Sequence, residues 1–294
     1  MGIHDKRYKK IFSNPFVMER FLKSFVHEDF IAKLDFSSMQ KIDKEYVSDE
    51  YVGTESDIVY KINFEGKEIY IFVLLEFQST VDKLMCFRFM NYISSLYLDF
   101  NKPDTKSKHP AVFPLLLYSG DNTWKYSNEI ADLIEDTIPG DYIPHLKYYP
   151  VLVNSFAKEK LKDIHNVISA MFYVENSDPD ELLKEVDILL DLIKEENTEV
   201  LNAFASWVNS YLSYLGNDDK EEIQDKIEDL QGVKTMFETR LKEYGNKLEI
   251  KGRKEEKNET AKNMLADNLS IDKISKYTGL SIEEIKSLKV PQKV

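Results

Sequence analysis

The run Tyr70–Ser79 (YIFVLLEFQS) constrains the fold of this chain most, because it has the pattern of a buried strand that ends in polar residues. Glu76 and Gln78 interrupt the apolar run, and residues two apart on a strand project from the same face. A second acid, Asp57, opens the preceding apolar run, so a hairpin would carry both carboxylates to one place. Paired carboxylates of this kind are typical of a divalent metal site and of phosphodiester chemistry.

These polar residues also have a simpler interpretation. Glu76 and Gln78 could line the rim of a sheet, with Asp57 pairing a lysine at a strand start. Two features favour the metal site. Glu76 lies among apolar neighbours, where an unpaired charge is costly, and Asp57 begins a strand that should lie next to it.

Bulk composition indicates a folded protein without a membrane span. The chain has 294 residues, 43% of them hydrophobic, with 17 Tyr and 17 Phe. It contains no run of 18 apolar residues, and its start lacks the apolar core of a secretory signal, so we expect a cytoplasmic protein. The single cysteine, Cys86, excludes an intramolecular disulfide framework, and its apolar neighbours favour a packing role.

The net charge of −13 argues weakly against nucleic-acid binding, because phosphate contacts depend on Lys and Arg. From Arg240 onward, 13 Lys/Arg stand against 9 Asp/Glu, a net charge of +4 that leaves −17 on residues 1–239. The tail is therefore the better polyanion contact, although a solvated helix explains most of its mixed charges equally well.

The first half of the sequence predicts a mixed α/β core. Asn14-Pro15 is a helix start signal for the amphipathic run that follows, and Glu65-Gly66-Lys67 is a turn between two strands. The further expected elements are an extended piece near Lys41–Val47, a helix over Val81–Phe100, and strands over Val112–Tyr118 and Tyr148–Val153.

The second half predicts mainly helices, from Lys158 to Tyr244, with a Lys- and Glu-rich linker near Lys251–Glu259. Two short helical patterns around Gly279 then outline a helix-turn-helix. Its second helix begins with acids that repel phosphate, so we expect packing or protein contact there rather than DNA docking. The long helices suit a scaffold or a homo-oligomer surface. The predicted divisions are 1–155, 156–250 and 251–294.

The residues around the paired carboxylates resemble a known signature. Asp57, a hairpin and Glu76-Phe-Gln78 are similar to the PD-(D/E)XK nuclease motif, in the variant with glutamine in place of the final lysine. More narrowly, the chain resembles the recombination-promoting nuclease/putative transposase family of bacteria. The segments that carry this resemblance are His4–Lys9, Phe12, Leu34–Phe36, Glu55–Asp57, Leu74–Ser79, Met85, Arg88, Tyr92, Pro114–Gly120 and Ile274–Ser281.

The resemblance implies a restriction-endonuclease-like α/β fold that cuts DNA with Mg²⁺, or with Mn²⁺ as a substitute, in recombination, mobile-element or phage-defence biology. It also implies that Asp57 and Glu76 bind the metal, that the carbonyl of Phe77 completes the ligand set, and that Gln78 takes the place of the lysine. The missing positive charge would then come from another residue, and the candidates are Lys9, Lys61 and Arg88.

Several alternatives stay open at this point. His4 and Asp5 either assist at the metal site or cap the first helix, and Arg88 either holds a phosphate or pairs with Glu76. The remaining histidines show no metal-ligand spacing. For the whole chain, the main expectation is a Mg²⁺-dependent DNA endonuclease. The rivals are a catalytically inactive DNA-binding or protein-interaction module of the same fold and an RNA-cleaving nuclease.

Overall fold

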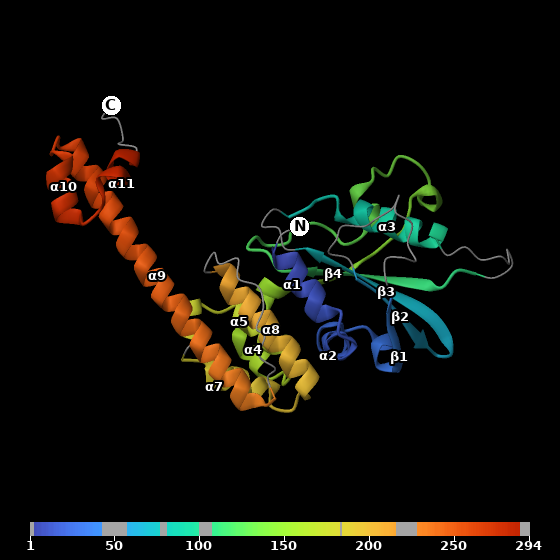
Figure 1. Cartoon of the computed structure of the whole chain (residues 1–294). Helices are drawn as coiled ribbons and strands as arrows, with labels where there is room; N and C mark the ends of the chain where they lie inside the picture. Colours follow the sequence, from blue (N-terminus) through green and yellow to red (C-terminus); the bar gives the residue numbers. More distant parts are fainter. Residues whose placement is uncertain are drawn as a thin grey trace.

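The computed structural model describes residues 3–42, 58–76, 81–99, 108–182, 184–215 and 228–288, which form a mixed α/β protein. Its five strands form one mixed sheet in the order β1-β2-β3-β4-β5 (Figure 1). Strands β1 to β3 pair antiparallel, whereas β3, β4 and β5 run parallel to one another. The strands are β1 (Leu34–Ile42), β2 (Ile58–Phe64), β3 (Lys67–Glu76), β4 (Ala111–Tyr118) and β5 (Tyr149–Leu152).

The hairpin predicted between the two apolar runs is confirmed. Phe64 pairs with Lys67, and the two turn residues, Glu65 and Gly66, have φ angles of 49° and 79°. Two consecutive positive φ angles are what a two-residue hairpin loop needs to match the twist of its strands. The pairing continues in regular register to Ile58, which lies opposite Val73.

The helices largely follow the predicted order. The helix at Asn14-Pro15 is confirmed, since the Asn14 side chain accepts hydrogen bonds from the first backbone amides of α2. Helix α3 begins at Met85, four residues later than expected, and β1 begins at Leu34, well before the predicted extended piece, whose residues 43–47 lie outside the described part. The helices are α1 (Ile3–Phe12), α2 (Pro15–Phe25), α3 (Met85–Asp99), α4 (Lys158–Lys162), α5 (Val167–Glu175), α6 (Pro179–Leu182), α7 (Val186–Ile193), α8 (Thr198–Leu215), α9 (Leu230–Ala266), α10 (Ile271–Thr278) and α11 (Ile282–Ser287).

One face of the sheet shares a single hydrophobic core with most of the helices. Side chains of β2, β3 and β4 on this face pack against α1, α2, α5 and α8, and the first part of α9 closes the core from outside (Figure 1). Tyr8 of α1 stacks on Phe12 and meets the edge of Trp207 from α8. The N-terminal helix therefore lies between the sheet and helices that follow it by about 200 residues in the sequence.

The opposite face of the sheet has its own smaller core beneath α3. Phe72 of β3 packs here with Phe89 of α3, and Tyr148 stacks on Phe89 from the connection that leads to β5. Both faces of the central strands are thus covered, which is typical of the parallel part of a mixed sheet. Among the described helices, none is both long enough and apolar enough to cross a membrane.

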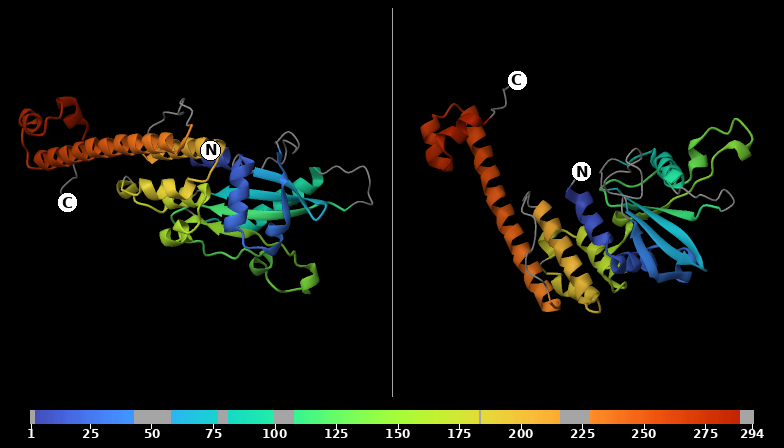
Figure 2. Two further views of the ribbon diagram at one scale, coloured as in Figure 1. Left: turned by 90° about the horizontal axis from the view of Figure 1, so that it is seen from below. Right: turned by 45° about the vertical axis from the view of Figure 1, so that its right-hand side comes forward.

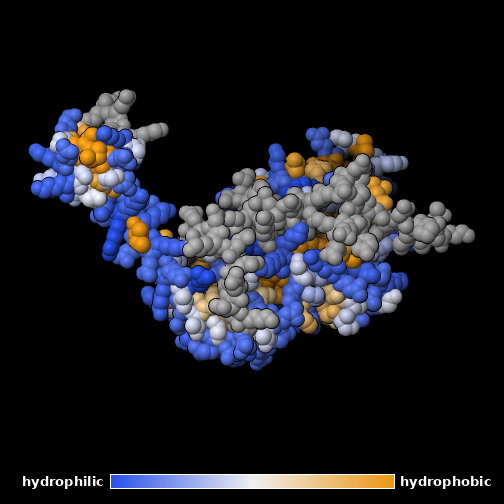
Figure 3. Space-filling model, in the orientation of Figure 1, coloured by the Kyte–Doolittle hydropathy of each residue, from blue (hydrophilic) through white to orange (hydrophobic). Residues whose placement is uncertain are grey.

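Helix α9 corrects the predicted linker. Lys251–Glu259 lies inside this continuous 37-residue helix, so the predicted division at 250/251 also falls within it. Charged residues one turn apart, such as Glu249 and Arg253, pair along the helix and support it without a tertiary partner. Figure 2 shows the helix leaving the body of the molecule, and Figure 3 shows that this exposed stretch is largely hydrophilic.

The last two helices pack on the far end of α9, as Figure 1 shows, and their predicted positions are confirmed. Gly279 adopts the left-handed conformation (φ 71°) that ends α10, and Ser281 with Glu284 forms a capping box that starts α11. A small core joins the three helices, made by Ala261, Ile274, Leu280 and Ile285.

A polar cluster, buried on the side of α1 and partly buried on the side of β4, ties α1 to the end of β4. We call it the Glu175 cluster: Arg7, Tyr8, Ser119 and Glu175. The Ser119 hydroxyl donates a hydrogen bond of 2.5 Å to the carboxylate of Glu175, and Tyr8 and Arg7 approach the same carboxylate. Burial raises the pKa of Glu175 to about 7, against the opposing effects of Ser119, Tyr8 and Arg7.

Tyr60→Phe tests how α1 is held on the sheet. The buried Tyr60 hydroxyl donates a 2.7 Å hydrogen bond to the carbonyl of Phe12, the last residue of α1. Losing it should reduce the free energy of unfolding by about 1–3 kcal/mol, because a buried acceptor is left without its donor. Urea denaturation measures this. Tyr142→Phe, at a side chain that is 76% exposed, is the matched control and should change nothing. Equal stability of both variants would contradict the assignment.

Glu175→Gln should alter the pH dependence of stability. Because the folded-state pKa is about 7 against an ordinary value of 4.5, the native protein keeps a proton that the unfolded chain releases between these pH values. Glu175 therefore makes stability fall as pH rises from about 4.5 to about 7, by up to about 3 kcal/mol. Urea denaturation at pH 5 and pH 8 should show this slope in the wild type and a smaller slope in the variant; parallel profiles would refute it.

Candidate functional site

The carboxyl end of β3 is where the predicted site residues meet the fold. Glu76 is the last residue of β3 and pairs with Tyr118 at the end of the parallel strand β4. Strand β2 runs the other way and begins at Ile58, opposite Val73. The start of β2 and the end of β3 therefore lie at the same end of the sheet. Ile58, which follows Asp57 in the sequence, lies opposite Val73, and Val73 precedes Glu76 by three residues.

The predicted ligand set itself lies largely outside the described residues. This holds for Asp57, Phe77 and Gln78, and for the side chain of Glu76. Where side chains are described, no group of three or more His, Cys, Asp or Glu could hold a metal ion. The assignment of Asp57, Glu76 and Gln78 to a metal site therefore stays a prediction.

The pleat of the two strands divides their side chains between the two cores. Val59 and Phe72 belong to the core beneath α3, whereas Ile58 and Val73 belong to the core that holds α1. Glu76 follows Phe72 by four residues and so has the same strand parity. Regular alternation would place the predicted site on the α3 side of the sheet end.

The structure separates the three candidates for the missing positive charge. Lys61 lies beside Tyr70 in the sheet and pairs with Glu68 at 3.2 Å. Tyr70 precedes Glu76 by six residues, so Lys61 lies roughly 20 Å from Glu76 along the strand direction. Lys61 is therefore too far from Glu76 to act there.

Arg88 is the better placed cation. It lies in the first turn of α3, on the face of the sheet that has the parity of Glu76, and its guanidinium contacts the Asp82 carboxylate at 3.3 Å. The Arg88 side chain is 27% exposed, so solvent reaches it. Lys9 lies in α1, which packs against β3 on the opposite face.

Sequence reasoning missed the Glu175 cluster. Its members come from α1, from the turn after β4 and from the end of α5, so no local spacing relates them. A signal was nevertheless present: Glu175 ends the apolar run Val167–Val174, as Glu76 ends its own apolar run. His4 and Asp5 occupy the first turn of α1, just before Arg7 and Tyr8, and their side chains lie outside the described part.

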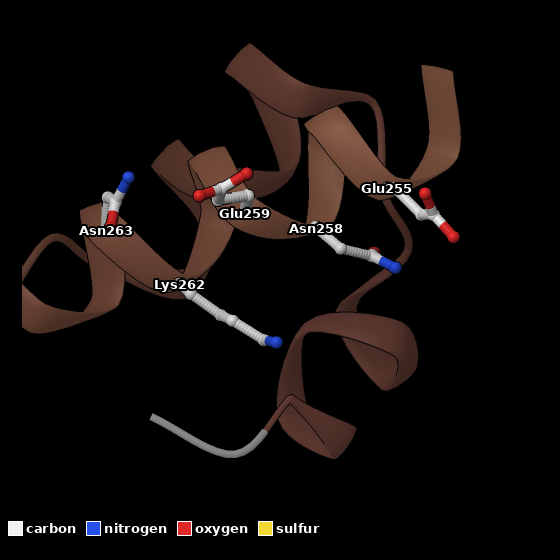
Figure 4. Close-up of a pocket in the computed structure, with 5 residues that line it drawn as sticks. All are labelled: Glu255, Asn258, Glu259, Lys262 and Asn263. Carbon is white, nitrogen blue, oxygen red and sulfur yellow. The ribbon is translucent and has the colours of Figure 1, made fainter. Parts of the chain in front are cut away.

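Among the residues that the structure describes, the other reactive groups offer no competing site. Burial raises the pKa of the Cys86 thiol to about 11, which confirms its packing role and keeps it protonated at neutral pH. A surface hollow of about 390 Å³ lies on α9, far along the helix from the sheet (Figure 4). Its lining is Glu255, Asn258, Glu259, Lys262 and Asn263, which come from one exposed helix surface and carry both signs of charge.

Comparison with known proteins identifies relatives for most of the chain. Recombination-promoting nuclease RpnA of Escherichia coli (strain K12) is 22% identical over 286 residues, which cover 96% of this chain and 95% of that protein. Recombination-promoting nuclease RpnD of Escherichia coli O157:H7 is 26% identical over 117 residues, or 40% of this chain and 45% of that protein.

A third relative carries a different description. The inactive recombination-promoting nuclease-like protein RpnE of Escherichia coli (strain K12) is 23% identical over 134 residues, or 45% of this chain and 44% of that protein. The matches thus span less than half of RpnD and of RpnE, and nearly all of RpnA. No solved structure matches the chain. The family described as "Putative transposase, YhgA-like" matches residues 2–201, about two thirds of the sequence, and this protein therefore belongs to that family.

Proposed function

We propose that this protein is a metal-dependent DNA endonuclease that hydrolyses phosphodiester bonds, with its site at the carboxyl end of β3. The observation that carries the proposal is the register of the hairpin: Ile58, which follows Asp57 in the sequence, lies opposite Val73, so the start of β2 and the end of β3 at Glu76 lie at the same end of the sheet. The names of RpnA and RpnD, both recombination-promoting nucleases, support the reaction class and make DNA the expected substrate.

The architecture supports a PD-(D/E)XK core. The sequence patterns predict the order helix, three strands, helix and strand, and the described chain supplies α1 and α2, then β1, β2 and β3, then α3 and β4. Strand β3 is central, antiparallel to β2 and parallel to β4 after the crossover through α3. Polar residues at the carboxyl end of such a strand lie where α/β sheets commonly place their ligand sites.

The donor chemistry fits a hard divalent cation. Asp57 and Glu76 offer carboxylate oxygens, which Mg²⁺ prefers, and we assign both residues as its ligands, with Mn²⁺ as a substitute. A bound divalent ion would lower the pKa of a water molecule and neutralise charge on the phosphate. The protein part of the mechanism is to hold these two carboxylates together at the end of a buried sheet.

Gln78 and Arg88 complete the proposed site. Gln78 stands where the motif usually has lysine, and its amide can donate a hydrogen bond to a phosphate oxygen or orient a water, but it cannot act as a base. Arg88 supplies the positive charge from α3, and a guanidinium can bind two phosphate oxygens at once. On binding DNA, Arg88 would exchange its contact with Asp82 for a contact with a phosphate.

Asp57→Ala and Glu76→Ala should each abolish metal-dependent cutting, because one carboxylate alone holds the cation poorly. The assay is cleavage of supercoiled plasmid and of single-stranded DNA and RNA, with Mg²⁺, Mn²⁺ or EDTA, using protein whose folding is checked by circular dichroism. Glu68→Ala is the matched control, since this exposed acid lies at the other end of β3. Equal cutting by the wild type and Asp57→Ala would refute the proposal.

Gln78→Ala should slow cleavage by about 10- to 100-fold at saturating DNA, because one hydrogen-bond donor to the reacting phosphate is lost. Gln78→Lys should keep the activity, since an ammonium group can make the same contact. Single-turnover rates with bound DNA separate this effect from affinity. A wild-type rate in Gln78→Ala would remove Gln78 from the site, and a dead Gln78→Lys would show that the pocket requires the amide.

A second candidate is an inactive DNA-binding or protein-interaction module. Two observations favour it: glutamine replaces lysine at position 78, and the relative RpnE is described as inactive. The wild type and the Asp57→Ala and Glu76→Ala variants also decide between the nuclease and the inactive module. The module predicts no cutting of any substrate, together with a salt-sensitive DNA affinity that survives Asp57→Ala and Glu76→Ala.

A further inference from the structure

The Glu175 cluster lies at the same end of the sheet as the proposed site, on the side of α1. Ser119 is the first residue after β4, and its predecessor, Tyr118, is the partner of Glu76 in the parallel pair. The hydrogen bond from Ser119 to Glu175, 2.5 Å long, therefore joins the end of α5 to the sheet one residue beyond the level of Glu76.

The turn that Glu175 holds is bound firmly on its other side. The Tyr118 hydroxyl donates to the carbonyl of Asn122 at 2.9 Å, and the Asn154 amide donates to the carbonyls of Gly120 and Asn122 at 2.6 and 3.2 Å. These bonds fix the turn to β4 and to the segment after β5. A contact at Ser119 therefore also restricts the position of the end of β4.

Helix α1 is held at the same point. Buried Arg7 donates to the carbonyl of Ser210 in α8 at 2.5 Å, and its guanidinium lies 5.9 Å from the centre of the Tyr211 ring. The buried residue Tyr8 interacts with Glu175. Two neighbouring residues of α1 are thus fixed against α8 and α5, which sets both the rotation and the height of this helix.

The first turn of α1 depends on this anchoring. His4 and Asp5 precede Tyr8 by four and three positions, and residues so spaced share one face of a helix. The backbone position of that face relative to the end of β3 is therefore determined at Tyr8, one turn away.

We propose that Glu175 is a positioning residue of the nuclease site: its carboxyl group, which accepts from Ser119 and interacts with Tyr8, fixes α1 and the end of β4 relative to each other at the end of the sheet where β3 stops. This inference rests on the proposed function. Apolar packing alone would hold α1 in the core, but the hydrogen bond from Arg7 to Ser210 and the interaction of Tyr8 with Glu175 restrict how it slides and turns.

The test compares four variants of the full-length protein. Glu175→Ala removes both contacts, Glu175→Gln keeps oxygen and nitrogen atoms in the same place, and Ser119→Ala removes only the link to β4. The matched control is Glu185→Ala, which also removes a partly buried acid, but one that pairs at 2.8 Å with Lys158 of α4.

Hydrogen–deuterium exchange measures how firmly α1 and the end of β4 are held, and it does not require activity. Glu175→Ala and Ser119→Ala should speed exchange in the segments 3–12 and 115–122 by about tenfold, because local opening becomes easier, whereas Glu175→Gln and Glu185→Ala should not. Unchanged exchange in Glu175→Ala, or the same increase in Glu185→Ala, would overturn the inference. If Glu175→Ala does not fold, Ser119→Ala and Glu175→Gln decide the matter.

Cleavage then tests the link to the site. Single-turnover cutting at saturating DNA should fall by about 10- to 100-fold in Glu175→Ala, with DNA affinity in Ca²⁺ unchanged, and should recover in Glu175→Gln. A loss of affinity without a loss of rate would overturn the positioning role. If the wild type cuts nothing, the proposed function fails, and the exchange data show separately whether Glu175 holds the two segments together.

Discussion

Burial of both faces of β3 is the constraint on which the rest of the structure depends. Ile71 and Val73 pack in the core that contains α1, and Phe72 packs in the core beneath α3. A strand enclosed in this way can carry charged residues only at its ends, because a buried charge without a partner is costly. The hairpin turn closes one end of the β2–β3 pair in solvent, so the end at Glu76 is where polar chemistry can gather.

The same constraint explains why distant segments meet at that end. Covering the first face requires α1 from the start of the chain together with α5 and α8 from its second half. Where these helices reach the sheet end, the apolar core gives way to the Glu175 cluster. Its carboxyl group sits among hydroxyls near the positive charge of Arg7, and this setting makes its burial tolerable. The helical half therefore belongs to the same core as the sheet and reaches the end of the sheet through Glu175.

Elements whose signals are local could be predicted from the sequence. The Glu65–Gly66 turn, the Asn14 cap and the α10–α11 pair all depend on residues within one or two turns, and all are confirmed. The position of Glu175 at the end of an apolar run was a local signal, but its partners could not be foreseen, because Ser119 and Glu175 are 56 positions apart and meet only through tertiary packing. Helix α9 was mistaken for a linker because its Lys- and Glu-rich composition resembles a flexible segment, although the same charges support a helix when they pair one turn apart. The site at Asp57, Glu76 and Gln78 remains a prediction.

The electrostatics of the sheet end favour Arg88 as the replacement for the missing lysine. Lys61 is kept away by the register, which places it beside Tyr70 at the opposite part of the hairpin. Arg88 is engaged with Asp82, but both side chains are partly exposed, and ion pairs of this kind contribute only about 0–1 kcal/mol. The Asp82 contact alone would therefore oppose a phosphate only weakly, and a phosphate would offer the guanidinium a bidentate partner. In the proposed site this contact would form only with bound substrate. It would therefore differ from a lysine beside the carboxylates, because the positive charge would come from α3 and would depend on how α3 lies over β3.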